Sequence, residues 1–263
     1  MNTTFQNCSP FGVKIAGIQL SDAADHDIAN LKQLLAYNGV VIIQNQSIDD
    51  AEFVAFLKRL GSLMFTAGET PVPHQPWLNL VTSVGRDRAP RSVFHTDTSY
   101  LAQPPAYTSL KAILLPESGG ETLFANQYIA FETLPTQVKE KLRDAIVLHV
   151  ASGVKLDNDQ ESQAWHPLFQ RHPISGKIAL FLSTPERCQA IQGLSLEESS
   201  RIIGLLYKHS IRAHKLYRHH WKSGDIIIWD NRCTMHRADH SEVIGDRVLH
   251  RGLVASETGL NTP

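Results

Sequence analysis

The period of the hydrophobic positions changes along this chain, and it predicts helices near the beginning. Apolar residues at helical spacing predict a helix over Asp27–Tyr37, with Gly39 as a stop signal. The apolar run Val40–Ile43 predicts a buried strand, and a second apolar stripe predicts a helix over Asp49–Leu60. We therefore expect a helical N-terminal part at about residues 20–62.

Strand-like patterns dominate the middle and the end of the chain. Short β-like runs alternate with turns between Leu78 and Asn126, and strand patterns return from His219 to Ala255. Strands in two separate regions predict a mainly β protein with flanking α-helices. The core would be one antiparallel barrel or jelly roll, and residues 1–263 would form a single domain.

A helical insertion is expected between the two strand regions, at about residues 135–213. The pattern over Pro135–Leu148 predicts a helix with proline in its first turn. The pattern over Leu196–Ala213 predicts another helix, which Ser195 and Glu198 would open as a capping box.

Composition narrows the classes of function without selecting one. The net charge of -1 gives no reason to expect nucleic acid or an anionic membrane as a partner. Three scattered cysteines argue against a disulfide framework and against a cysteine-based zinc site. The N-terminal residues do not resemble a secretory signal, and no apolar run approaches the roughly 18 residues of a membrane span. We expect a cytoplasmic protein.

The stretch His95-Thr96-Asp97 is the first that indicates chemistry. The run Ser92–Tyr100 reads as a strand, and side chains two residues apart in a strand project from the same face. Imidazole and carboxylate would then point together while Thr96 faces away. His236, just after a strongly apolar strand, could complete the 2-His-1-carboxylate arrangement of non-haem Fe(II) oxygenases.

Several alternatives stay open at this point. The pair His240 and Glu242 offers a competing H-x-E, although its polar surroundings are typical of a solvated loop. A lone histidine in an apolar strand is more often structural than a ligand. Histidine and aspartate also suit Zn²⁺, so a metal-dependent hydrolase on a cupin-like barrel is one alternative. A non-catalytic β-sandwich binding module is another.

Basic and hydroxyl side chains near the same region favour an anionic ligand. Arg247 and Arg251 lie four residues apart, so on a regular strand they face the same side. A guanidinium at a pocket mouth is suited to a bidentate grip on a carboxylate. Thr122 follows a Gly-Gly turn and could add a hydroxyl. A solvated basic strand is the alternative reading, and it stays open for one of the two arginines.

Taken together and in this order, the motifs resemble the TauD/TfdA (taurine dioxygenase-like) family of Fe(II)/2-oxoglutarate-dependent dioxygenases. The resemblance runs from about His95 to Val254 and covers HTDTSY, GGETLFAN, HPLFQRHPISGK, WDN-x4-H and RVLHR. It implies a double-stranded β-helix core, that is, a cupin-like jelly roll. It also implies site roles: His95, Asp97 and His236 as iron ligands, Thr122 and Arg251 at the distal carboxylate of 2-oxoglutarate, and Arg247 near cosubstrate and substrate.

The resemblance further implies a reaction, in which O2 and 2-oxoglutarate hydroxylate a substrate C–H and release succinate and CO2. Family members act on sulfonates, sulfate esters and aryloxyacids, and many form dimers or tetramers. We expect a small anionic organic substrate. Arg91 is the candidate anchor for its charge, and His74 and Phe94 are candidates for shaping the pocket under a Pro/Gly-rich lid.

Overall fold

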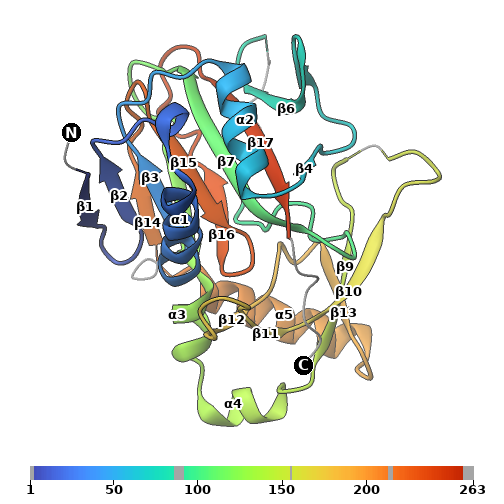
Figure 1. Ribbon diagram of the computed structural model, residues 1–263. Coiled ribbons are helices and arrows are strands. Elements are labelled where there is room, and N and C mark those ends of the chain that lie inside the picture. Colours follow the sequence, from blue (N-terminus) through green and yellow to red (C-terminus); the bar gives the residue numbers. More distant parts are fainter. Residues whose placement is uncertain (1–2, 86–91, 155, 213–215, 257–263) are drawn as a thin grey trace.

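The computed structural model describes residues 3–85, 92–154, 156–212 and 216–256. A larger and a smaller β-sheet face each other in a jelly-roll core (Figure 1). The larger sheet contains β1 (Thr4–Asn7), β2 (Val13–Ala16), β3 (Val40–Ile43), β4 (Leu63–Met64), β5 (Pro71–Val72), β6 (Gln75–Thr82), β7 (Pro105–Leu114), β15 (Ile226–Asp230) and β17 (Val248–Ala255). The smaller sheet contains β8 (Thr122–Asn126), β14 (Leu216–His219) and β16 (Thr234–Ala238).

The strand order shows how distant parts of the chain meet. The larger sheet runs β1-β2-β3-β15-β7-β17-β6-β5, with β4 paired to β17, and the smaller runs β14-β8-β16. Strands from the middle and the end of the sequence are therefore neighbours in both sheets, and β2 and β3 pair in parallel while the other pairs are antiparallel. The predicted mainly β fold with a jelly-roll core is confirmed.

The central strands are apolar throughout because both of their faces are buried. In β3, Val41 and Ile43 pack toward the helices, whereas Val40 and Ile42 pack between the sheets. Successive strand residues alternate between these two cores. Phe124 comes from the opposite sheet into the inner core, so the strands of both sheets pack closely against each other there.

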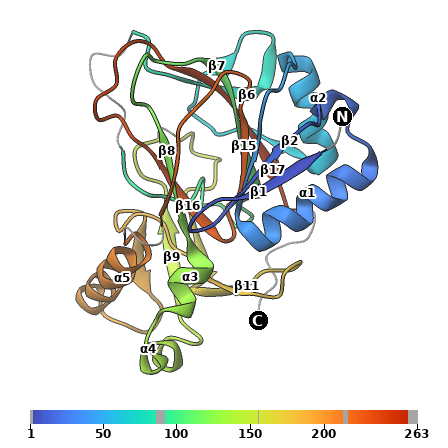
Figure 2. The same ribbon diagram turned by 90° about the vertical axis from the view of Figure 1, so that its left-hand side faces the viewer.

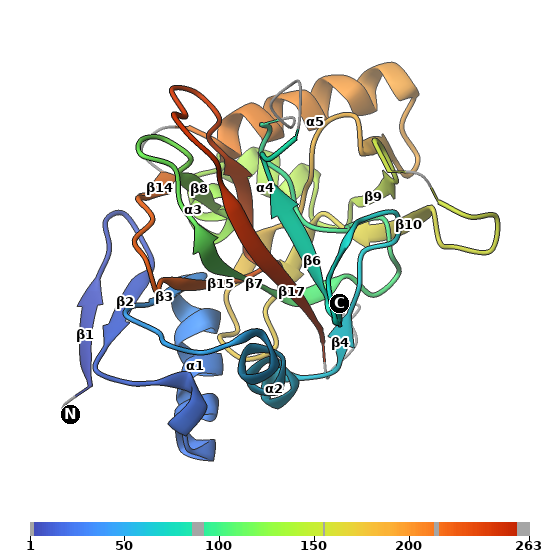
Figure 3. The ribbon, with the colours of Figure 1, turned by 90° about the horizontal axis from the view of Figure 1, so that it is seen from above.

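Helices α1 (Asp25–Asn38) and α2 (Asp50–Leu60) cover the outer face of the larger sheet, after a short 3₁₀ helix at Leu20–Asp22 (Figure 3). Both helices predicted for the N-terminal part are confirmed. Gly39 ends α1 with φ 74°, in the left-handed region that favours glycine. Since β3 lies between the two helices and joins the larger sheet, the N-terminal part belongs to the core.

The insertion between β8 and β14 is mixed rather than helical. It contains α3 (Gln127–Glu132), α4 (Thr136–Lys141), β9 (Ile146–Val150), β10 (Gln163–Pro167), β11 (Phe169–Arg171), β12 (Ile178–Leu180), β13 (Cys188–Ile191) and α5 (Leu196–Ser210). It lies at one end of the jelly roll (Figure 2).

The single helix predicted over Pro135–Leu148 is wrong. The helix ends at Lys141, and the following Ile146–Val150 run forms β9 between β10 and β13. The residues of β9 alternate between half-buried and buried positions with a period of two, and three of the five are β-branched. The capping box of Ser195 and Glu198 is present at the start of α5. None of the helices in the described parts of the chain is long and apolar enough to cross a membrane.

Candidate metal centre

His95, Asp97 and His236 lie close together in the structure. Within the described residues they are the one group of potential metal ligands, with ligand atoms within 4.8 Å of one another. His95 and His236 form an isolated antiparallel bridge, with both backbone hydrogen bonds at 3.0 Å. The bridge joins the segment before β7 to the edge of the smaller sheet and brings the two imidazoles together. The H-x-E pair at residues 240 and 242 forms no such group.

The strand predicted over Ser92–Tyr100 is wrong, although the two candidate ligands in it do come together. Only His95 pairs with a strand, and the chain turns from Asp97 onward, where Thr98 has φ 40°. The Thr96 hydroxyl donates to the carbonyl of Leu182 at 2.7 Å, so the insertion holds this segment instead of a neighbouring strand. The turn leaves Asp97 Oδ1 3.5 Å from His95 Nε2.

Hydrogen bonding and burial keep the three groups in the states that a metal needs. His95 Nδ1 lies 2.9 Å from the carbonyl of Val93 and donates to it, which leaves the lone pair on Nε2. Burial lowers the pKa of His236 to about 3, so its imidazole is neutral. Burial alone would raise the pKa of Asp97, but the adjacent His236, His95 and Arg251 hold it well below the usual range. A neutral imidazole at His236, the lone pair on His95 Nε2 and an ionised carboxylate at Asp97 are ligands ready for a divalent metal.

A cavity of about 180 Å³ lies against these ligands. Its walls include His95, Thr122, Trp229, His236, Arg247 and Arg251. The two arginines predicted to share a strand face do so, one just before β17 and one within it. Metal ligands and cationic groups therefore line the same cavity.

Arg247 is a buried cation without a carboxylate partner among the described residues. It is 4% exposed, and burial lowers the pKa of its guanidinium to about 10. Its Nη2 donates to the Thr122 hydroxyl at 3.3 Å, and its Nε has no hydrogen-bond partner within the described chain. Trp221 Nε1 also donates to that hydroxyl, at 3.1 Å, so the Thr122 proton is free for another acceptor. The pair is built to receive an anion.

Arg251 lies beside the candidate ligand Asp97. Its Nη1 is 3.9 Å from Asp97 Oδ1, and its Nη2 contacts Thr66 at 3.3 Å and Glu69 at 3.5 Å. The predicted grouping of Thr122 with Arg251 thus differs from the observed one, in which Arg247 contacts Thr122. Sequence spacing could not separate the two arginines because both side chains reach the same cavity.

Asn79 is a buried polar residue that the sequence analysis missed. It pairs with Arg251 across β6 and β17, and directly opposed residues project from the same face. Its side chain is completely buried, and both of its polar atoms lack partners within the described residues. An unpaired amide costs about 1–3 kcal/mol for each unmet group. An asparagine inside an apolar strand was the signal, since strands are poor in asparagine.

The candidate substrate residues fare differently. Arg91 lies outside the described residues. His74 has φ 62° and is exposed in the turn between β5 and β6. Among the described residues, it is not one of those that line the cavity beside His95 and His236. Phe94 packs with Leu123 on the outer face of the smaller sheet, because neighbouring residues alternate and His95 takes the inner face. We therefore withdraw Phe94 as a pocket residue.

A jelly roll with a His/Asp/His group beside the buried cation Arg247, which has no carboxylate partner among the described residues, is typical of a mononuclear metalloprotein with room for an anionic ligand. The family follows from comparison with known proteins. The family model described as "Taurine catabolism dioxygenase TauD, TfdA family" matches residues 4–253, and the chain belongs to this family.

Among known relatives, an "Alpha-ketoglutarate-dependent sulfonate dioxygenase" of Saccharomyces cerevisiae is 30% identical and matches 91% of this chain. An "Alpha-ketoglutarate-dependent 2,4-dichlorophenoxyacetate dioxygenase" of Cupriavidus pinatubonensis is 26% identical, with 92% of this chain and 93% of that protein covered. A crystal structure of a taurine dioxygenase from Burkholderia xenovorans superimposes with a TM-score of 0.84 at 25% identity, covering 97% of this chain and 91% of that one.

This chain is shorter than its yeast relatives. It spans 62% of the Saccharomyces cerevisiae protein and 66% of a Schizosaccharomyces pombe relative that is 32% identical, less than two thirds of each.

Proposed function

We propose that this protein is an Fe(II)- and 2-oxoglutarate-dependent dioxygenase that hydroxylates a C–H bond of a small anionic organic substrate, with release of succinate and CO2. The observation that carries the proposal is a single cavity lined both by His95 and His236, which group with Asp97, and by Arg247, a cation with no carboxylate partner among the described residues. A metal hydrolase needs no such buried cation beside its metal. The relatives named as α-ketoglutarate (2-oxoglutarate) dioxygenases support the same reaction class.

Bound iron and 2-oxoglutarate would supply the oxidising power drawn from O2, and the protein's own residues would bind and orient. We assign the distal carboxylate of 2-oxoglutarate to Arg247 and Thr122, in place of the expected Arg251 and Thr122. Arg247 offers Nε and the Thr122 hydroxyl still has a proton to donate. Carboxylate and guanidinium would then neutralise each other in a site from which water is excluded.

Arg251 is then available for the substrate. Its guanidinium lies beside Asp97, with Nη1 3.9 Å from the carboxylate, and its Nη2 lies 3.5 Å from the carboxylate of Glu69. We propose that an anionic group of the substrate displaces Glu69 from Arg251. Relatives named for sulfonates, sulfate esters and 2,4-dichlorophenoxyacetate act on anions, which fits a cation in this place.

Anaerobic titration tests the reaction class. Metal-free protein receives Fe(II) and then 2-oxoglutarate, and a visible charge-transfer band should appear only when both are present. Succinate formation should follow on addition of air and of a substrate from a panel of sulfonates, sulfate esters, aryloxyacids and carboxylates. Hydrolysis of the panel without 2-oxoglutarate would favour the metal hydrolase, and turnover of neutral compounds alone would refute the anionic substrate.

Paired arginine variants test the division of roles. Arg251→Met should raise the KM for the organic substrate and leave 2-oxoglutarate affinity nearly unchanged, whereas Arg247→Met should weaken 2-oxoglutarate binding. The opposite pattern would restore the assignment made from the resemblance.

Location and assembly complete the proposal. We propose a cytoplasmic protein, which the free thiols of Cys8, Cys188 and Cys233 support. A dimer or tetramer stays a prediction, which light scattering of the purified protein would check.

A further inference from the structure

A chain of buried hydrogen bonds leads from the inner core to the metal carboxylate. Trp229 Nε1 donates to Asn231 Oδ1 at 3.0 Å, and Asn231 Nδ2 donates to Thr108 Oγ1 at 2.8 Å. The Thr108 hydroxyl in turn donates to Asp97 Oδ2 at 2.7 Å. All four residues are buried, none more than 4% exposed, so no solvent competes for these bonds. The chain connects β15 to Asp97 through β7.

The direction of this chain follows from its first member. An indole N–H can only donate, so it fixes Oδ1 of Asn231 as the acceptor and turns the amide N–H₂ toward Thr108. The Thr108 oxygen accepts that hydrogen bond, and its single proton is then committed to Asp97. An asparagine with the reverse orientation would leave the Trp229 N–H buried and unpaired. Every bond therefore points toward the carboxylate.

The bonds leave the two oxygens of Asp97 in different situations. Oδ2 is occupied by the hydroxyl of Thr108, whereas Oδ1 faces His95 Nε2 at 3.5 Å and Arg251 Nη1 at 3.9 Å. We propose that Trp229, Asn231 and Thr108 are positioning residues, which hold the Asp97 carboxylate in one rotamer with Oδ1 directed to the metal. The proposal rests on the metal role of Asp97 proposed above.

The indole of Trp229 also contacts a second candidate ligand, His236. The rings of Trp229 and His236 lie with centroids 4.3 Å apart, so movement of the tryptophan would disturb His236 as well as Asp97. Trp229 also lies directly opposite Thr108 in the pairing of β15 with β7. The first and third residues of the hydrogen-bond chain are therefore held together by the same pair of strands. One core residue thus sets the positions of two ligands from different segments.

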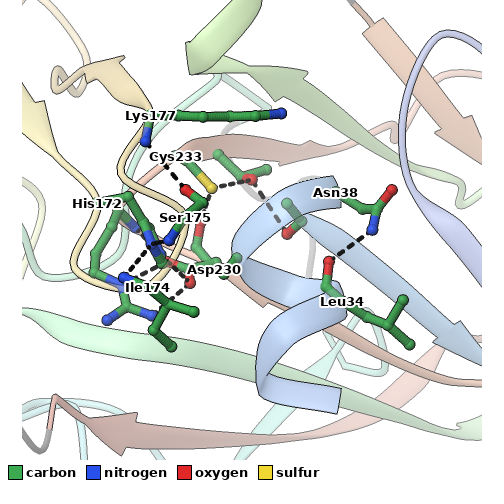
Figure 4. A network of polar contacts seen from close by, with 12 residues as sticks. Leu34, Asn38, His172, Ile174, Ser175, Lys177, Asp230 and Cys233 are labelled. Carbon is green, nitrogen blue, oxygen red and sulfur yellow. Dashed lines mark hydrogen bonds and ion pairs between the residues drawn. The ribbon is translucent and has the colours of Figure 1, made fainter. Parts of the chain in front are cut away.

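Asp230, between Trp229 and Asn231, forms hydrogen bonds that hold this segment on the side away from Thr108. Asp230 Oδ2 accepts from His172 Nε2 at 2.9 Å (Figure 4). Asp230 Oδ1 accepts from Arg232 Nε at 2.8 Å. His172 Nδ1 accepts the backbone N–H groups of residues 174 and 175, so Nε2 carries the proton. The insertion hairpin between β11 and β12 therefore holds Asp230, while its neighbours on both sides face the metal site.

Metal affinity tests the proposal without any need for turnover. Mn(II) binding to metal-free protein is measured by electron paramagnetic resonance for wild type, Thr108→Val, Thr108→Ser and Ser109→Ala. Loss of a hydrogen bond to a ligand typically weakens metal binding about 10- to 100-fold. We expect a loss of about 10-fold in Thr108→Val, with an altered Mn(II) spectrum, and little change in Thr108→Ser, which keeps the hydroxyl.

Ser109→Ala is the matched control, because Ser109 is the next residue of β7, is equally buried and donates to the carbonyl of Ile227 instead. Asn231→Ser cuts the chain one step earlier and should weaken Mn(II) binding in the same direction, so the test survives if Thr108→Val does not fold. Thermal unfolding of the metal-free proteins separates general instability from lost positioning.

The outcomes are distinct. Equal Mn(II) affinity in wild type, Thr108→Val and Asn231→Ser would overturn the positioning chain while leaving the metal site intact. An equal loss in Ser109→Ala would also overturn it, because the effect would then come from packing of β7. Absence of Mn(II) binding in the wild type itself would overturn the proposed function as well.

Discussion

Replacing Arg247 by methionine should affect the fold and the ligand in opposite directions. Burial lowers the pKa of this guanidinium to about 10, which corresponds to roughly 3 kcal/mol against the charged form at about 1.4 kcal/mol for each pKa unit. The variant avoids this cost but loses the hydrogen bond to Thr122, which lowers its stability by about 1 kcal/mol. Without ligand, the variant should be more stable by about 2 kcal/mol, and its Tm should rise by roughly 4–8 °C.

The same substitution should weaken the binding of 2-oxoglutarate. Truncating one partner of a buried charge pair costs about 2–5 kcal/mol, so 2-oxoglutarate should bind at least about 30-fold more weakly. Differential scanning calorimetry of the metal-free protein and calorimetric titration of 2-oxoglutarate into the Mn(II)-loaded protein measure the two effects. Arg171→Met, at an exposed arginine of β11, is the control and should change neither. A destabilised Arg247→Met variant that binds 2-oxoglutarate normally would show that Arg247 is structural.

Other parts of the molecule yield further predictions. Burial lowers the pKa of His149 from 6.5 to about 3, so below pH 6.5 the unfolded chain takes up a proton that the folded one refuses, and stability falls by about 2 kcal/mol between pH 7 and pH 5. His149→Phe should remove this loss in urea titrations at both pH values; an unchanged acid response would contradict it. Gly252→Ala should destabilise the fold by about 1–3 kcal/mol, since the new methyl group would overlap Leu57, and chemical denaturation with partial rescue by Leu57→Val checks this. Asp97→Ala should weaken Mn(II) binding by more than about 100-fold, beyond the loss expected for a mere hydrogen-bond partner; near-normal binding would remove Asp97 from the ligand set.

Local patterns were sufficient for much of the fold. The helices over Asp25–Asn38 and Asp50–Leu60 could be predicted because each buries one stripe and carries its own start or stop signal. The strand Val40–Ile43 could be predicted because both of its faces are buried. The run Ile146–Val150 could not, since a short apolar run fits a helix or a strand until its neighbours β10 and β13 are known.

The candidate ligands could likewise be found from a short sequence pattern, whereas the way in which they meet could not. His95 and Asp97 are near in sequence, so a pattern could single them out. They nevertheless meet through a turn and one bridge to His236 rather than through strand alternation. The outward direction of Phe94 follows from the same bridge, because His95 takes the inner face and its neighbour points the other way.

By itself, the sequence determined the mainly β class, the N-terminal helices and the three candidate ligands, because periodicity, caps and short motifs are properties of neighbouring residues. Only the tertiary structure decided that Arg247 is the cation paired with Thr122, and that Asn79 and Thr108 face the site. These depend on contacts between strands far apart in the chain. Burial also depends on those contacts. A buried arginine or threonine has no water to hydrogen-bond to, so any donor that the protein leaves unpaired needs a ligand as its partner.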